Sequence, residues 1–177
     1  MAYLAIDGTI ETDRLILRRA TADDTDAVAA LFSDLDIMRS YGTGRTFDRD
    51  ETLEAIARMT NHYDTYGYCA QMMLRKDDGE IVGMGGLQRG PLSECVQFGC
   101  VLAKHAWGNG YAFEAGVALL DYGFSELGLE RIEAITPASN ASAIAVVHKL
   151  GMNYEGVLLR DGTEYAIFAL ANATTKG

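Results

Sequence analysis

Two glycines, Gly108 and Gly110, stand between an apolar, strand-like run and a strongly periodic helical segment. Glycines at the start of a helix let backbone N–H groups converge without obstruction from side chains. Those unpaired N–H groups and the positive end of the helix dipole together bind phosphate or diphosphate groups. Residues 101–115 (VLAKHAWGNGYAFEA) therefore predict a site for an anionic cofactor that does not depend on lysine.

Two other kinds of phosphate-binding loop do not fit these residues. A Walker loop requires Gly-Lys-Ser/Thr, which the sequence lacks. A dinucleotide-binding fingerprint requires a small residue where Phe113 stands, and it opens its domain, whereas this loop follows an expected antiparallel hairpin. On these residues alone, a tight strand-to-helix turn without a ligand stays open as the alternative, because pairs of glycines are common in turns.

The elements before the loop begin with a strand at residues 14–19 and two helices. Thr21 and Asp48 are expected to begin the helices, because each has an acidic residue three positions later that completes a capping box. Helical spacing predicts one buried face in each helix. The first is made of Val28, Leu31, Phe32 and Leu35, and the second of Leu53, Ile56, Ala57 and Thr60.

Strands surround the loop, and one long helix follows it. Strands are expected at residues 68–75, 80–88 and 95–102, with a turn at Asp77-Asp78-Gly79, and all three are expected to pair antiparallel. The helix is expected at residues 111–127. Its apolar rows are Phe113, Val117, Leu120, Phe124 and Leu127, and Ala112, Ala115, Leu119 and Tyr122, which leaves Glu114, Asp121 and Ser125 in solvent.

The last third of the chain indicates a mixed sheet. A strand at residues 131–136 directly after a helix suggests a crossover to a parallel neighbour. Asn140 is expected to cap a short helix that buries Ala143, Val146, Val147 and Leu150, and strands at residues 153–159 and 164–170 flank an Asp161-Gly162 turn. The fold class is therefore α/β (α+β): a mixed, mostly antiparallel central sheet with helices on both faces, in one domain of residues 1–177.

Composition excludes several classes of protein. A net charge of −10 without clustered Lys and Arg argues against nucleic acid as a partner. The cysteines number three and show no CxxC spacing, so neither a disulfide framework nor a metal site is expected. No apolar run approaches membrane-spanning length and residues 1–13 lack a secretory pattern, so we expect no membrane partner and a cytoplasmic location.

Several ordered motifs together resemble one family. WGNGYAFEA, RIEAITPASNASAIAVVHKLGM, the opening ETDRLILRRATADD and the closing GMNYEGVLL are similar to the GNAT N-acetyltransferase superfamily, and within it to the RimJ/RimL-like branch that acetylates the N-termini of ribosomal proteins. The resemblance covers nearly the whole chain. The family's diphosphate loop, Gln/Arg-x-x-Gly-x-Gly/Ala, is matched by His105, Gly108 and Gly110.

This resemblance implies a binding mode for acetyl-CoA. The sheet would be splayed after the strand at residues 95–102, whose exposed backbone would pair with the pantetheine arm as if the cofactor were another strand. The amides of residues 108–112 would hold the diphosphate, and Asn140 would contact the cofactor near its reactive end. The implied cofactor-binding residues are Cys100, Val101, Leu102, Trp107, Gly108, Asn109, Gly110, Tyr111, Ala112 and Asn140.

The residues that would carry catalysis depart from the family's pattern. Many members have glutamate where Gln97 stands, and a carboxamide cannot accept a proton. Tyrosines of other branches are replaced by Cys100 and Val147. Ser142 matches the alternative acid of the RimJ/RimL-like branch, although serine is also favoured at helix starts for capping alone. The general base must then come from another carboxylate, and we expect Glu164, with Glu94, Glu155 and Asp161 as alternatives.

The function expected from the sequence is an acetyl-CoA-dependent N-acetyltransferase in which a primary amine attacks the bound thioester directly. The acceptor, a protein N-terminus or a small-molecule amine, stays open. Because Gln97 replaces the usual base, a non-catalytic acyl-CoA sensor is the first alternative, and a nucleotide-binding protein that uses the same loop is the second. Dimers are common in the family, so a homodimer also stays open.

Overall fold

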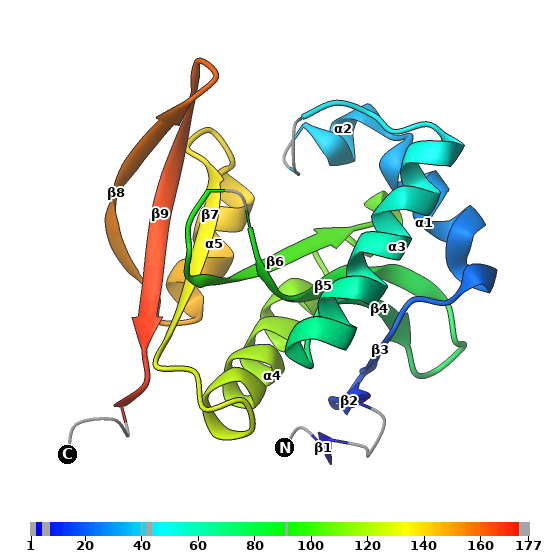
Figure 1. Cartoon of the computed structure of the whole chain (residues 1–177), viewed down its shortest axis with the longest axis horizontal. Coiled ribbons are helices and arrows are strands. Elements are labelled where there is room, and N and C mark those ends of the chain that lie inside the picture. The colour runs from blue at the N-terminus through cyan, green and yellow to red at the C-terminus, as the bar shows by residue number, and fades with distance from the viewer. Residues whose placement is uncertain (1–2, 5–7, 40, 42–43, 91, 174–177) are drawn as a thin grey trace.

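The computed structural model describes residues 3–4, 8–39, 41, 44–90 and 92–173. In these residues nine strands form one sheet with the order β1-β2-β3-β4-β5-β6-β7-β9-β8 (Figure 1). The strands are β1 (Tyr3–Leu4), β2 (Ile10–Glu11), β3 (Leu15–Arg18), β4 (Ala70–Arg75), β5 (Ile81–Arg89), β6 (Val96–Leu102), β7 (Arg131–Pro137), β8 (Asn153–Arg160) and β9 (Thr163–Ala171). The helices are α1 (Thr25–Phe32), α2 (Leu35–Met38), α3 (Arg49–Tyr66), α4 (Tyr111–Ser125) and α5 (Ala141–Lys149).

The helices cover both faces of the sheet. A core of α1, α2 and α3 residues packs on one face, against Met72, Met84 and Val101 of the central strands. A second core, formed by α4 and α5, packs on the other face, against Phe98, Ile132 and other strand residues. All neighbouring strands are antiparallel except β6 and β7, which are parallel. The predicted mixed, mostly antiparallel sheet with helices on both faces is confirmed.

Local signals placed the element boundaries well. Asp48 caps α3: its carboxylate accepts a hydrogen bond from the N–H of Glu51, whose side chain accepts one from the N–H of Asp48. Thr21 begins a 3-10 turn (Ala22–Asp24) that leads into α1. Two short strands, β1 and β2, precede the strand that was expected to be first, because β2 pairs with β3 and extends the sheet by its edge.

The buried face of α3 differs from the prediction. Leu53 is 46% exposed and Ala57 is also exposed, whereas Thr52, Ala55 and Ile56 are buried. The small side chains of Thr52 and Ala55 lie on the face of α3 that packs toward α1, and they allow the two helices to approach closely. Packing between the helices therefore determines which face of α3 is buried, and the size of the apolar side chains does not. Leu35, expected at the end of the α1 face, lies instead at the start of α2 and is 46% exposed.

The buried face of α4 agrees with the prediction at Ala115, Leu119 and Leu120 but differs at other positions. Phe113 and Val117 are exposed, while Gly116 and Gly123 lie against the core. A Cβ atom on Gly116 would approach Leu150 Cδ1 to 2.7 Å, and one on Gly123 would approach Ile132 Cδ1 to 2.6 Å. The helix therefore approaches the sheet through its glycines, which an apolar-stripe pattern does not detect. On α5, Val147 is buried as expected, but Ala143 and Val146 are only half-buried.

The sheet opens between β6 and β7. The two strands pair only at Val96 with Ile132 and at Gln97 with Glu133. Beyond Gln97, β6 continues to pair with β5, and β7 continues to pair with β9, but the two strands diverge from each other. The ribbons of β6 and β7 separate accordingly in Figure 1. The predicted splay is confirmed, and it begins one residue after Gln97.

Candidate functional site

The divergence leaves one edge of β6 without a partner strand. The N–H of Ala103 donates to the carbonyl of Val82 (3.0 Å), so Ala103 directs its backbone groups toward β5. Because these directions alternate along a strand, the N–H and C=O groups of Phe98, Cys100 and Leu102 point toward the open side. Those of Val101 point toward β5, and its side chain is buried in the α1–α3 layer. Of the three β6 residues expected at the cofactor, Cys100 therefore presents a free N–H and C=O, Leu102 presents a free N–H but a carbonyl that accepts from the Trp107 indole, and Val101 presents neither.

The glycine loop presents unpaired N–H groups. Gly108 (φ 76°) and Gly110 (φ 79°) both adopt the left-handed conformation, and Gly110 is the N-cap of α4. The first backbone bond of the helix runs from Glu114 N to Gly110 O (3.1 Å). Within the described part of the chain, the N–H groups of residues 108–113 donate no hydrogen bond. Such a run at a helix start binds an anion by geometry and by dipole.

The side chains of Asn109, Trp107 and Arg14 form hydrogen bonds with the backbone of this loop and of the strand before it. The Asn109 side-chain amide donates to the Trp107 carbonyl (3.1 Å), and the Trp107 indole donates to the Leu102 carbonyl (2.9 Å). Arg14 Nη1 donates to the Asn109 carbonyl (3.0 Å) and its guanidinium lies 4.7 Å from the centre of the Tyr111 ring. The Tyr111 side chain is buried in the core and Ala112 is half-buried. Both residues therefore present their backbone N–H groups, and not their side chains, to a ligand at the loop.

Arg14 and Glu114 lie beside the loop, and sequence reasoning missed both. Glu114 was expected in solvent, but its side chain is only 16% exposed and accepts hydrogen bonds from Thr12 (2.6 Å) and from Arg14. Burial acts to raise the pKa of Glu114, but the hydrogen bonds from Thr12 and Arg14 outweigh it and lower the pKa. No local signal could reveal the pair, because 100 residues separate its members.

Asn140 and Ser142 lie at the same end of the sheet as the loop. The loop follows β6 and Asn140 follows β7, and the carboxyl ends of parallel neighbours meet at one edge of a sheet. As predicted, Asn140 caps α5: its side-chain oxygen Oδ1 accepts from Ala143 N (3.1 Å). It also accepts from the Ser142 hydroxyl (2.8 Å), which is exposed. The hydroxyl must therefore rotate before it can donate to another acceptor.

The carboxylates considered as bases differ in their surroundings. Glu164 is exposed near the start of β9, and its backbone carbonyl accepts from Ala138 N (2.8 Å) at the open end of the split. Alternation with the buried Ala166 and Phe168 puts its side chain on the α5 side of the sheet. Glu155 is bound by the Arg131 guanidinium (2.9 and 2.5 Å), whose hydrogen bonds lower the pKa of this carboxyl. A low pKa makes Glu155 a weak base.

Two polar residues at the foot of the split are buried. Gln97 is 9% exposed, and among the described residues its Nε2 atom has no hydrogen-bond partner. Glu133, its partner across the strands, is 7% exposed and bound to Arg131 (2.9 Å). Burial acts to raise the pKa of Glu133, but hydrogen bonds from Ser93, Arg131 and Cys95 outweigh it and lower the pKa. Neither side chain is therefore suited to take a proton from an amine.

The remaining candidates carry little chemistry. Burial raises the pKa of the Cys100 thiol to about 12, so the thiolate that a covalent acyl carrier requires is disfavoured. His105 Nε2 lies 3.3 Å from Glu80 Oε1.

In the described part of the chain, no group of three or more His, Cys, Asp and Glu side chains has the arrangement of a metal site. None of the helices in that part has the length and apolar character that a bilayer crossing requires.

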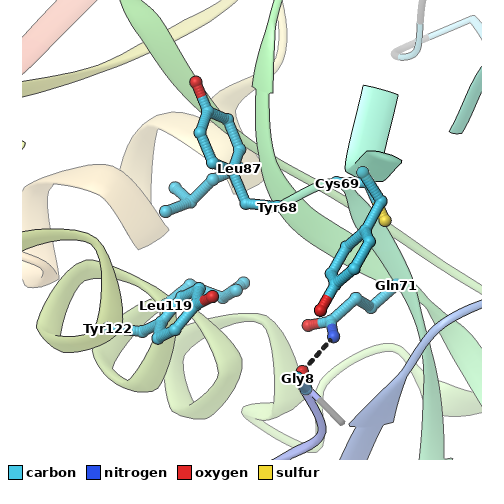
Figure 2. A pocket seen from close by; sticks show the side chains of 8 residues that line it. Gly8, Tyr68, Cys69, Gln71, Leu87, Leu119 and Tyr122 are labelled. Atoms are coloured by element: carbon cyan, nitrogen blue, oxygen red, sulfur yellow. Dashed lines mark hydrogen bonds between the residues drawn. The ribbon is translucent and has the colours of Figure 1, made fainter. Parts of the chain in front are cut away.

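One small cavity lies away from this site (Figure 2). Its volume of about 10 Å³ suits about one water molecule. Residues of β4, β5, α3 and the second half of α4 enclose it, whereas the glycine loop lies at the opposite end of α4. The lining residues are Gly8, Tyr63, Tyr68, Cys69, Gln71, Leu87, Leu119 and Tyr122, and the dashed line in Figure 2 joins Gln71 Nε2 to the Gly8 carbonyl (2.7 Å). It has no bearing on cofactor binding.

Comparison with known proteins points to one family. The sequence profile described as "Acetyltransferase (GNAT) domain" matches residues 14–153. The chain is 31% identical over 161 residues to "Uncharacterized N-acetyltransferase YoaA" of Bacillus subtilis (strain 168), an alignment that covers 88% of this chain and 91% of the relative.

Solved structures agree with that match. The fold is similar to an acetyltransferase from Agrobacterium tumefaciens str. C58, with a TM-score of 0.78, 28% identity and coverage of 95% and 96% of the two chains. It is also similar to the ribosomal L7/L12 α-N-protein acetyltransferase RimL in complex with coenzyme A, with a TM-score of 0.75 and coverage of 90% and 95%. At 18% identity, this second likeness concerns the fold alone.

Proposed function

The chain belongs to the acetyltransferase (GNAT) family and is an N-acetyltransferase, and from that premise we propose that it moves the acetyl group of acetyl-CoA to a primary amine by direct attack. In this proposal a C–N bond forms as the thioester C–S bond breaks, the amine loses a proton and the departing thiolate gains one. Acetyl-CoA supplies the activated thioester. The protein supplies binding, orientation and proton transfer.

One observation supports the proposal above the others: a run of unpaired N–H groups at residues 108–113 lies at the end of a free strand edge. Coenzyme A has matching chemistry, with a diphosphate for the helix start and amides along its pantetheine arm for the edge of β6. We infer that the N–H and C=O of Cys100 and the N–H of Leu102 bind the arm. A free N–H on this edge is also the proposed donor to the oxyanion that forms during acetyl transfer.

The proposed proton transfers use the open end of the split. Ser142, held by Asn140, is proposed to protonate the thiolate after its hydroxyl rotates. Glu164 is proposed to accept the amine proton through water, because its carboxylate is exposed and forms no ion pair with any described residue. Gln97 contributes no base, so water relay has a larger part here than in members with glutamate at this position.

We propose that the acceptor is a protein N-terminus or a small-molecule amine, and that the closest branch is RimJ/RimL-like. The opening motif ETDRLILRR and the GMNYEGVLL motif support this branch. A non-catalytic acyl-CoA sensor is not favoured, because the family profile is an acetyltransferase domain and the relative from Bacillus subtilis is named an N-acetyltransferase. We further propose that residues 1–177 form one domain, since a single sheet runs through the described residues.

Thiol release from acetyl-CoA tests this function. The purified full chain is incubated with acetyl-CoA and a panel of N-terminal peptides, amino acids and polyamines, and free thiol is measured. Amine-dependent release supports the enzyme, whereas binding of acetyl-CoA without release under every acceptor would indicate a sensor. Calorimetry with acetyl-CoA, ATP and NAD tests the remaining alternative, a nucleotide-binding protein that uses the same loop. Tight binding of ATP without binding of acetyl-CoA would refute the proposal.

A further inference from the structure

Arg14, which lies outside the glycine loop, contacts three of its residues: Asn109, Gly110 and Tyr111. It lies at the entrance to β3, and its guanidinium donates from Nε to Glu114 Oε2 (2.7 Å) and from Nη1 to the Asn109 carbonyl (3.0 Å). Its Nη2 lies 2.6 Å from the same Glu114 carboxylate. The planar guanidinium fork allows these bonds to form together, which a lysine could not do.

The bond to Asn109 determines the direction of an N–H group. In a planar trans peptide the C=O and the following N–H point in opposite directions. Arg14 binds the Asn109 carbonyl, so the N–H of Gly110 must point away from Arg14, toward the side where the loop is open. The Asn109 side chain has the same effect two peptides earlier, because it binds the Trp107 carbonyl and so directs the N–H of Gly108. A Cβ on Gly110 would lie 3.6 Å from Arg14 Nη2, which places the guanidinium directly behind the loop.

Arg14 also offsets a negative charge in the first turn of α4. Glu114 lies one turn into the helix, and its carboxylate is largely buried. A carboxylate so near a diphosphate site repels the ligand unless a cation balances it. No lysine or arginine lies among residues 105–113, and Asn109 occupies the middle of the loop. The balancing charge therefore comes from Arg14, which directly precedes β3 and is distant from the loop in sequence.

We propose that Arg14 is the positioning residue of the glycine loop: it turns the Asn109–Gly110 peptide so that the Gly110 N–H faces the cofactor diphosphate, and it neutralises Glu114 beside that diphosphate. The inference rests on the proposed use of acetyl-CoA and goes beyond it, because it assigns a residue outside the loop to diphosphate binding. Arg14 itself need not touch the ligand. Its role is to hold loop atoms that do.

The test compares two acetyl donors. Acetyl-CoA carries the diphosphate, whereas S-acetyl-pantetheine has the same thioester and amide arm without it. Arg14→Gln is expected to raise the KM for acetyl-CoA about tenfold, with kcat little changed, because a charge-assisted hydrogen bond and its orientation are lost. The kcat/KM for S-acetyl-pantetheine is expected to stay within about twofold of the wild-type value, since that donor does not use the loop.

Three further variants complete the design. Arg14→Lys is expected to lose less than Arg14→Gln, because the charge that balances Glu114 remains although the fork that also binds the Asn109 carbonyl is lost. Arg14→Gln/Glu114→Gln is expected to recover part of the loss, because the unbalanced carboxylate is removed together with its partner. Arg18→Gln is the matched control: Arg18 lies on the same strand and pairs with Asp24 at 2.7 Å, away from the loop. It should leave the preference between the donors unchanged.

The outcomes separate the inference from the function beneath it. Equal losses on both donors in Arg14→Gln, or no loss on either, would overturn the positioning role while the wild-type enzyme remained active. A double variant no better than Arg14→Gln would overturn the neutralisation of Glu114. If the wild-type chain transferred acetyl from neither donor to any amine, the proposed function would fail first, and the inference with it.

Discussion

Replacing Gly110 with leucine should have two separable effects: a small loss of stability from backbone strain, and a larger loss of CoA binding from the reorientation of N–H groups. Gly110 has a φ of 79°, and within 4 Å a Cβ at this position would meet only Arg14 Nη2, at 3.6 Å. The free protein therefore has room for the first side-chain atom, and its cost is conformational: about 1–2 kcal/mol for a left-handed L-residue. For a chain of this length that corresponds to a fall in Tm of roughly 2–8 °C.

The effect on coenzyme A should be much larger than this strain. A residue that leaves the left-handed region turns the neighbouring peptides, so that their N–H groups no longer point toward the phosphates. Each charge-assisted hydrogen bond that is lost costs about 1.5–3 kcal/mol, so the Kd for CoA should rise roughly 10- to 100-fold or more. Isothermal calorimetry with CoA and a thermal melt of the same sample measure the two effects separately.

Gly162→Leu supplies the control. Gly162 has a φ of 77° in the turn between β8 and β9, and a Cβ there would meet nothing within 4 Å. Both substitutions should therefore lower Tm by similar amounts, while only Gly110→Leu should weaken CoA binding. Unchanged affinity in Gly110→Leu would remove the loop from the binding site. An equal loss of affinity in Gly162→Leu would show that general destabilisation, and not the loop, accounts for the effect.

Three shorter predictions address other groups. Ser142→Ala should lower kcat about 100-fold with little change in the KM for acetyl-CoA if the hydroxyl protonates the thiolate, and unchanged steady-state kinetics would leave it only as a partner of Asn140. Gln97→Met should raise the free energy of unfolding in urea by about 1 kcal/mol, because it removes a buried amide without a partner among the described residues; a decrease would contradict this. The hydrogen bond from Arg18 lowers the pKa of Asp24 below 3.8, so this carboxylate stabilises the fold above pH 3.8 and loses that contribution as the pH falls through its lowered pKa. Asp24→Asn should accordingly be less sensitive to acidification in thermal melts, and an identical pH dependence in both proteins would refute the assignment.

Sequence reasoning succeeded where the physical cause lies within a few residues. The capping box of Asp48 and Glu51, the cap at Asn140 and the Asp161-Gly162 turn all act over at most three positions, and each is present in the structure. The strand order near the site was also predictable in part, because a strand after a long helix returns to the sheet in parallel, as β7 does beside β6.

Sequence reasoning failed where the burial of a residue depends on elements that are distant in the sequence. The stripe of large apolar residues predicted a face of α4 that includes Phe113 and Val117, yet those residues are exposed. The helix instead packs through Gly116 and Gly123, because those positions meet side chains of the sheet and of α5. Which face a helix buries depends on the shape it meets, and a periodic pattern within one helix contains no information about that shape.

The site was predicted in the same uneven way. Gly108 and Gly110 were found from local sequence, because their conformation and the helix start are local properties. The direction of the Val101 backbone depends on its register with β5, and the contact between Arg14 and Glu114 joins positions 100 residues apart. Neither could be read from spacing, although both determine which N–H groups face a ligand.

The packing of α4 differs between the two ends of the split between β6 and β7. At the closed end, Gly123 packs against Ile132 of β7 and Leu87 of β5, so the helix holds these strands in one layer. Seven residues earlier, Gly116 packs against Phe98 of β6 and Leu150, which directly follows α5. At that level α4 contacts the α5 region and not β7, and the buried Val147 and Leu150 complete the core below the opening. An extended ligand that pairs with β6 therefore gains strand hydrogen bonds without breaking existing ones between β6 and β7, and the free edge is part of the folded state.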